Sequence, residues 1–111
     1  ALAQASAKNV GVFPNPYFAF NPQETTRLSR FVTFNNLPET ATIRIFNLAG
    51  QLVARLDKSD ASQFIRWNLL NLSNLPVASG MYIAHVDMPA LGATKVLKLA
   101  IIQEGEVLET F

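Results

Sequence analysis

The side chains best suited to chemistry in this sequence are its single histidine, His85, and the carboxylate that follows it, Asp87. Two residues apart on an extended strand, both would project from the same face. Catalysis by such a histidine also requires a nucleophile beside the imidazole and an acid that orients the ring. The chain has no cysteine, and one histidine with one carboxylate does not complete the set. We therefore interpret the two residues as a surface pair and expect no enzyme activity.

The sequence also offers few residues that could bind a metal or a cofactor. A protein metal site needs three or four ligands, and one histidine with scattered carboxylates does not supply them. Asp57 and Asp60, with loop carbonyls, are the conceivable ligands for calcium, but carboxylates are few there. No glycine-rich phosphate loop is present. We expect no metal and no cofactor.

Composition limits the other classes of function. The 111 residues suit one domain. Half of them are apolar and only 15% are charged, against about 25% in an average chain. Two interpretations stay open: a core-rich β domain with uncharged polar residues outside, or a domain that buries part of its surface against a neighbour.

Charge and hydropathy exclude two kinds of partner. The net charge of +1 gives no basic footprint for nucleic acid. No apolar run approaches the roughly 20 residues that span a bilayer, so we expect no membrane insertion.

The elements that must position any site are β-strands. Apolar and polar residues alternate with the period of two that is typical of strands, and no segment has a helical period. Seven strands are expected, in residues 9–13, 30–37, 40–48, 51–56, 62–70, 81–86 and 94–102. Asn47 and Gly50 predict a tight turn in a hairpin over 42–56, and 58–60 reads as a polar turn. Because one sheet alone would leave an apolar face in water, two antiparallel sheets are expected to pack as a sandwich.

The domain limits follow from the same pattern. Residues 1–8 are small and polar and read as a linker, 9–102 form the sandwich, and 103–111 form an acidic tail. Residues 14–27 hold three prolines and read as a long irregular connection.

Four stretches together resemble a known family: NVGVFPNPY (9–17), FNNLPETATIRIFNLAGQLVARL (34–56), WNLLNLSNLPVASGMYIAHV (67–86) and TKVLKLAII (94–102). In this order they resemble the C-terminal Ig-like module of large secreted and surface proteins of the Bacteroidetes. That module is similar to the Ig-like domain of flagellar hook-capping proteins and to the C-terminal sorting domains of type IX secretion substrates.

The resemblance implies an all-β, Ig-like sandwich and a non-catalytic role. It implies secretion sorting or anchoring of an exported protein at the outer-membrane surface or outside the cell, with secretion machinery as a partner. The alternative is a structural subunit or accessory domain that packs against other domains or subunits of a larger extracellular assembly or filament.

Several residues are expected to have a structural role. Pro14, Asn15, Pro16 and Tyr17 mark the corner where the first strand leaves its sheet, because each proline fixes its own φ and restrains the residue before it. Gly50 belongs to the hairpin turn and Gly80 precedes a strand. Trp67 shares a face with Ile65 and Leu69 and is expected in the core.

Two further features concern bonds and surfaces. The hydroxyl of Tyr82 is expected to reach a backbone group, as in a tyrosine corner. Phe31, Met81 and Ile83 fall on faces assigned outward. They form an interface patch if they cluster, or lie under the chain's own long connection.

Overall fold

The computed structural model describes residues 9–19 and 30–103. The expected linker 1–8, most of the long connection and residues 104–111 of the tail lie outside this part of the chain. The described residues form eight strands: β1 (Gly11–Phe13), β2 (Tyr17–Ala19), β3 (Val32–Asn35), β4 (Thr40–Asn47), β5 (Leu52–Ser59), β6 (Ile65–Trp67), β7 (Gly80–Met88) and β8 (Ala93–Gln103). The 3₁₀ turn η2 (Pro89–Leu91) connects β7 to β8.

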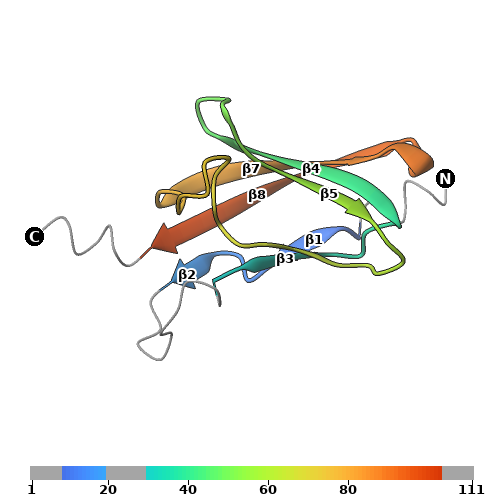
Figure 1. Ribbon diagram of the computed structural model, residues 1–111, viewed down its shortest axis with the longest axis horizontal. Coiled ribbons are helices and arrows are strands. Elements are labelled where there is room, and N and C mark those ends of the chain that lie inside the picture. The colour runs from blue at the N-terminus through green and yellow to red at the C-terminus, as the bar shows by residue number, and fades with distance from the viewer. Residues whose placement is uncertain (1–8, 20–29, 104–111) are drawn as a thin grey trace, which may run out of the picture.

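The strands form two sheets that lie face to face (Figure 1). The smaller sheet has the order β1-β3-β6, and the larger has the order β2-β8-β7-β4-β5. The first described segment of the chain contributes to both sheets, with β1 in the smaller and β2 in the larger. The prediction of an all-β, Ig-like sandwich is confirmed. No helix among the described residues is long and apolar enough to cross a membrane.

The core lies between the sheets and is built from alternate residues of the facing strands. Ile43 and Ile45 of β4 are fully buried, and so are Val32 and Phe34 of β3. Trp67 of β6 lies opposite Val32 in the register and is 1% exposed. The period-two alternation therefore gave the inward faces of these strands correctly.

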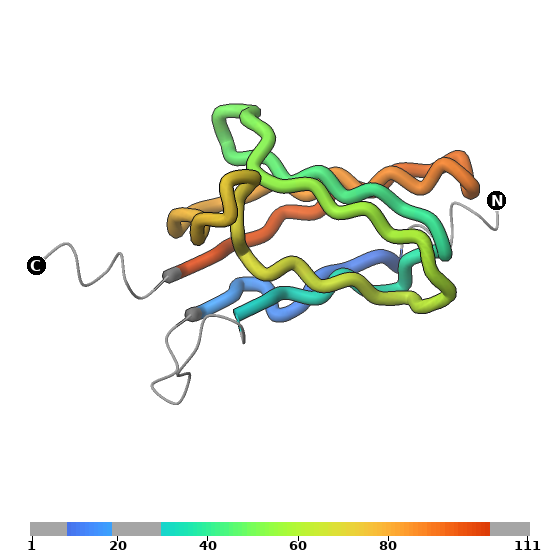
Figure 2. The backbone as a smooth tube through the Cα atoms, viewed as in Figure 1, coloured from blue at the N-terminus to red at the C-terminus, as the bar shows by residue number. Residues whose placement is uncertain are grey.

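One strand was missed, in the segment that the prolines made look irregular. The segment 14–27 contains β2, which pairs in parallel with the end of β8, so the larger sheet is mixed rather than antiparallel. In Figure 2 the first blue segment runs along one layer beside β3 and then joins the last strand of the other layer. A strand of three residues is too short to show alternation, and nearby prolines favour an irregular segment. The sequence pattern therefore does not reveal β2.

Three boundaries also differ from expectation. β5 continues through Lys58 to Ser59, where a polar turn was predicted. Leu69 is buried but lies beyond β6 with a φ of 64°, so it is not a third inward residue of that strand. The predicted loop 88–93 contains η2.

Candidate functional site

His85 and Asp87 lie on the outer face of the larger sheet, as expected from their spacing. The register places His85 between Arg44 of β4 and Val96 of β8. Neither neighbour is a nucleophile or an orienting carboxylate. Within residues 9–19 and 30–103 there is no group of three or more histidine, cysteine or acidic residues that could hold a metal ion.

The two aspartates considered for calcium each have a cationic partner instead. Asp57 contacts the Arg55 guanidinium at 3.2 Å and accepts a hydrogen bond from the Thr42 hydroxyl at 3.1 Å. The hydrogen bond from Arg55 is the main cause that lowers the pKa of Asp57; desolvation opposes it, and the hydrogen bond from Thr42 adds to the lowering. Both carboxylates are engaged within their own part of the fold.

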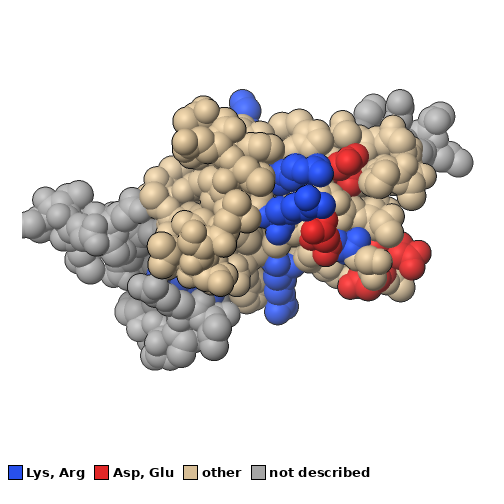
Figure 3. Space-filling view, turned by 45° about the horizontal axis from the view of Figure 1, so that its top comes forward, with Lys and Arg blue, Asp and Glu red and all other residues tan. Residues whose placement is uncertain are grey.

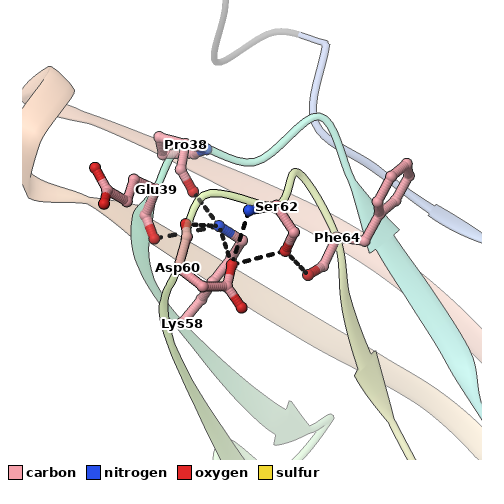
Figure 4. Close-up of polar contacts among 6 residues, drawn as sticks. All are labelled: Pro38, Glu39, Lys58, Asp60, Ser62 and Phe64. Carbon is pink, nitrogen blue, oxygen red and sulfur yellow. Dashed lines mark hydrogen bonds and ion pairs between the residues drawn. The ribbon is translucent and has the colours of Figure 1, made fainter.

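The ammonium of Lys58 is held by several polar contacts, and the side chain is only 1% exposed. It donates to the backbone carbonyls of Pro38 at 2.7 Å, Glu39 at 3.2 Å and Asp60 at 2.9 Å, and lies 3.0 Å from the Asp60 carboxylate. Figure 4 shows these oxygens converging on the nitrogen from two loops. We call this cluster the Lys58 clasp.

The clasp extends through Asp60 to Ser62 in the same β5–β6 connection. The Asp60 carboxylate accepts the Ser62 backbone N–H at 3.1 Å and lies 2.7 Å from the Ser62 hydroxyl. Hydrogen bonds from Ser62 and then from Lys58 lower the pKa of Asp60. Because the clasp ties the start of β4 to the β5–β6 connection, its role is structural, and the satisfied ammonium explains why a lysine can be buried.

The proline-rich corner is held by the side chain of Asn15. Its amide nitrogen donates to the Lys98 carbonyl at 2.7 Å, and its oxygen accepts the Ala100 N–H at 3.1 Å. Pro14 and Pro16, both preceded by cis peptide bonds, flank it between β1 and β2. Tyr17, the first residue of β2, is 5% exposed. The corner therefore lies where the chain changes sheets, as predicted, but the two bonds of Asn15 were not foreseen.

Trp67 and Tyr82 lie near the same end of the fold, since Tyr82 pairs with Leu99, between the two residues that Asn15 bonds. Their rings meet edge to face, with centroids 6.3 Å apart and planes at 71°. The indole N–H of Trp67 donates to the Leu70 carbonyl at 3.0 Å. The Tyr82 hydroxyl donates to the Ala78 carbonyl, which is the backbone contact that the sequence predicts. Together these bonds fix the connection between β6 and β7.

The predicted turn residues lie where the hairpin and the strand require them. Gly50 has a φ of 84° in the β4–β5 turn, a conformation that is open to glycine at little cost. Its N–H donates to the Asn47 carbonyl at 3.0 Å. Gly80 is the first residue of β7.

Phe31, Met81 and Ile83 do not form one patch. Met81 and Ile83 lie on the outer face of the larger sheet, where Met81 is 41% exposed and Ile83 is half-buried. Phe31 precedes β3 in the other sheet and is half-buried, with the Arg66 guanidinium 4.3 Å from its ring centroid. They lie on opposite sheets and do not cluster, so the condition for one patch is not met; the alternative, cover by the long connection, falls mostly on residues outside the described part of the chain.

An uncharged end of the molecule was missed by the sequence reasoning. Four leucines of the β4–β5 turn and of the 68–79 connection are 41–71% exposed: Leu48, Leu52, Leu72 and Leu75. We call them the leucine end. Beside them lies an open groove of about 520 Å³, lined by uncharged residues that include Asn47, Asn71 and Tyr82. Figure 3 shows charged side chains across the middle and right of this face, with few on the left. The signal for this surface in the sequence was the presence of leucines inside predicted turns, where side chains are usually exposed.

Comparison with known proteins gives structural relatives only. No protein-family model matches the chain, and no curated protein matches it. Among solved structures, it aligns with PorZ, a bacterial surface component of the type IX secretion system of Porphyromonas gingivalis, at 24% identity and a TM-score of 0.70, over 90% of this chain and 12% of PorZ.

Two further structures are similar. Dimeric latent PorU from P. gingivalis aligns at 21% identity and a TM-score of 0.59, over 86% of this chain and 9% of PorU. FlgD from P. aeruginosa aligns at 18% identity and a TM-score of 0.42, over 80% of this chain and 69% of FlgD. The chain thus spans about a tenth of PorZ and of PorU, and at these identities the first two comparisons show that it shares their sandwich fold.

Proposed function

We propose that this chain is a non-catalytic module of an exported bacterial protein and acts in secretion sorting or anchoring. The observation that carries the proposal is the sandwich itself, which aligns over 90% of its length with PorZ, a surface component of the type IX secretion system. The ordered motifs that resemble sorting domains, from the Asn15 corner to TKVLKLAII, give independent support. The proposed location is the outer-membrane surface or the extracellular space, with secretion machinery as the partner.

The polar groups of the fold favour a module without catalysis. Lys58 and Asp60 bond to each other and to loop carbonyls, and Asn15 bonds to a strand edge. Each serves to hold elements of the sandwich together. His85 has neighbours in register that cannot support nucleophilic catalysis.

The leucine end favours a second candidate. Four exposed leucines around an uncharged groove are suited to contact with a neighbouring domain or subunit, because burial of apolar surface is the main driving force of such contacts. On this account the chain is a structural subunit or accessory domain of a larger extracellular assembly or filament.

Deletion of residues 14–102 from the protein that carries this chain separates the two candidates. Under the sorting proposal, the truncated protein is synthesised normally but stays inside the cell. Under the structural alternative, it is exported normally and fails to assemble. Immunoblots of whole cells, outer membrane and medium give the comparison, and normal export with normal assembly would contradict both.

A further inference from the structure

One edge of the larger sheet is open along half of its last strand. β8 has eleven residues, but β2 covers only the last three of them. The side chain of Asn15 occupies the next stretch of the same edge, at Lys98 and Ala100. β1 approaches β8 but pairs with β3, and in the described part of the chain no strand or loop on this side hydrogen-bonds to the backbone of residues 93–97 of β8.

Alternation along β8 identifies the backbone groups that face this edge. The Lys98 carbonyl and the Ala100 N–H point toward Asn15. Residues two and four positions before Lys98 turn their N–H and C=O groups the same way. These are Val96 and Thr94, and their side chains are exposed, Val96 by 57%.

Asn15 shows that the edge accepts a peptide-like partner. Its side-chain amide presents one carbonyl and one N–H donor, and it bonds β8 as the backbone of an added strand would. We propose that residues 94–98 of β8 form a docking edge, at which an extended segment of a partner protein adds as a further strand before the position that Asn15 occupies. Addition of a strand to an exposed sheet edge is a general mode of peptide recognition.

The side chains along the docking edge define the chemistry of the partner segment. β8 carries Lys95 and Lys98 and no acidic residue, so glutamate or aspartate in the added strand is favoured by charge. The exposed Val96 favours an apolar side chain opposite it. Lys95 and Val96 project from opposite faces of β8, so a partner segment that alternates acidic and apolar residues can place a carboxylate beside Lys95 and an apolar side chain beside Val96.

The other sheet edges fit an added strand less well. β1 and β6 have three residues each. On β5 the Val53 carbonyl already accepts the Leu72 N–H at 3.0 Å, and Arg55 and Asp57 form a salt bridge on its outer face. The inference goes beyond the proposed role and does not depend on it, because an open edge can take a strand in a sorting module or in a structural one.

The test uses ¹⁵N-labelled protein and a seven-residue peptide of alternating valine and glutamate. We expect amide shift changes confined to β8 and its neighbours, largest at Thr94, Val96 and Lys98. The same peptide N-methylated at alternate residues should bind at least about tenfold more weakly, because its hydrogen-bonding edge is blocked. A peptide with lysine in place of glutamate should also bind more weakly.

A matched pair of variants locates the site. Val96→Pro removes an N–H that faces the open edge and makes no bond within the sheet, so it should abolish binding, whereas Val96→Ala should retain it. Shift changes at another edge, equal binding of the N-methylated peptide, or no binding at millimolar peptide would overturn the proposal. If Val96→Pro does not fold, the comparison with the N-methylated peptide still tests whether the peptide adds as a strand.

Discussion

At the scale of single residues, the fold depends on two polar side chains that act over long sequence distances. Lys58 draws together carbonyls that lie 19 and 20 residues before it. Asn15 bonds to backbone groups 83 and 85 residues after it. Each removes the cost of leaving polar groups unpaired inside or at the edge of the sandwich.

Replacement of Lys58 by methionine tests the clasp. The methionine keeps most of the buried apolar stem but removes the donor to the Pro38 and Asp60 carbonyls, whereas the Glu39 carbonyl keeps the Asp60 N–H and the Asp60 carboxylate keeps Ser62. We expect the free energy of unfolding to fall by about 2–4 kcal/mol, measured by urea denaturation. Lys98→Met, at an exposed position, is the control and should change it by less than about 0.5 kcal/mol. Equal stability of the two variants would show that the clasp contributes nothing.

Asp60 gives the clasp a defined pH dependence. Its pKa in the folded state lies below the ordinary 3.8 because of Ser62 and Lys58, so protonation favours the unfolded chain. The stabilisation is complete above about pH 3.8 and is lost as the pH falls through the folded-state pKa. In urea titrations from pH 7 downward, Asp60→Asn should show a smaller loss of stability in acid than the unmodified chain. Parallel curves for the two proteins would argue against this role.

At the scale of elements, the corner at residues 14–16 lets one segment serve both sheets. β1 pairs with β3 in the smaller sheet and β2 pairs with β8 in the larger. Asn15 lies between them and bonds the stretch of the β8 edge just before the residues that β2 covers. The corner thus joins the two layers through a side chain as well as through the backbone.

Asn15→Ala should weaken this junction. Both hydrogen bonds to β8 are lost, and since they lie at an exposed edge water can replace part of them. We expect a loss of about 1–2 kcal/mol in the free energy of unfolding, and faster hydrogen exchange at the Ala100 amide. Asn15→Asp retains an acceptor for the Ala100 N–H but no donor for the Lys98 carbonyl, so that amide should stay partly protected. Unchanged exchange at Ala100 in the alanine variant would refute the account of the corner.

The sequence predicts those elements whose pattern is local. Ile43 and Ile45 alternate with Thr42 and Arg44, so their faces could be assigned from spacing alone, and the turn at Gly50 followed from residue type. Lys58 could not be placed in the same way, because its acceptors come from a distant loop. β2 was hidden because a partner 84 residues away, rather than its own composition, makes it a strand.

At the scale of the whole molecule, the surface has two features available for contact. The leucine end presents exposed apolar side chains around an uncharged groove. The docking edge of β8 presents backbone groups that can pair with a strand. The low share of charged residues, 15%, leaves open whether the domain buries part of its surface against a neighbour. The positions of the leucine end and the docking edge could be found only from the structure.

The central claim is that this chain acts in secretion sorting, and transplantation of the module onto another protein tests it most directly. Residues 1–111 are fused to the C-terminus of a fluorescent protein that carries a signal for export to the periplasm, and the fusion is expressed in P. gingivalis; the reporter alone is the control. The account predicts that the fused reporter reaches the cell surface or the medium while the control stays in the periplasm. A folded fusion that remains in the periplasm with the control would contradict the sorting role.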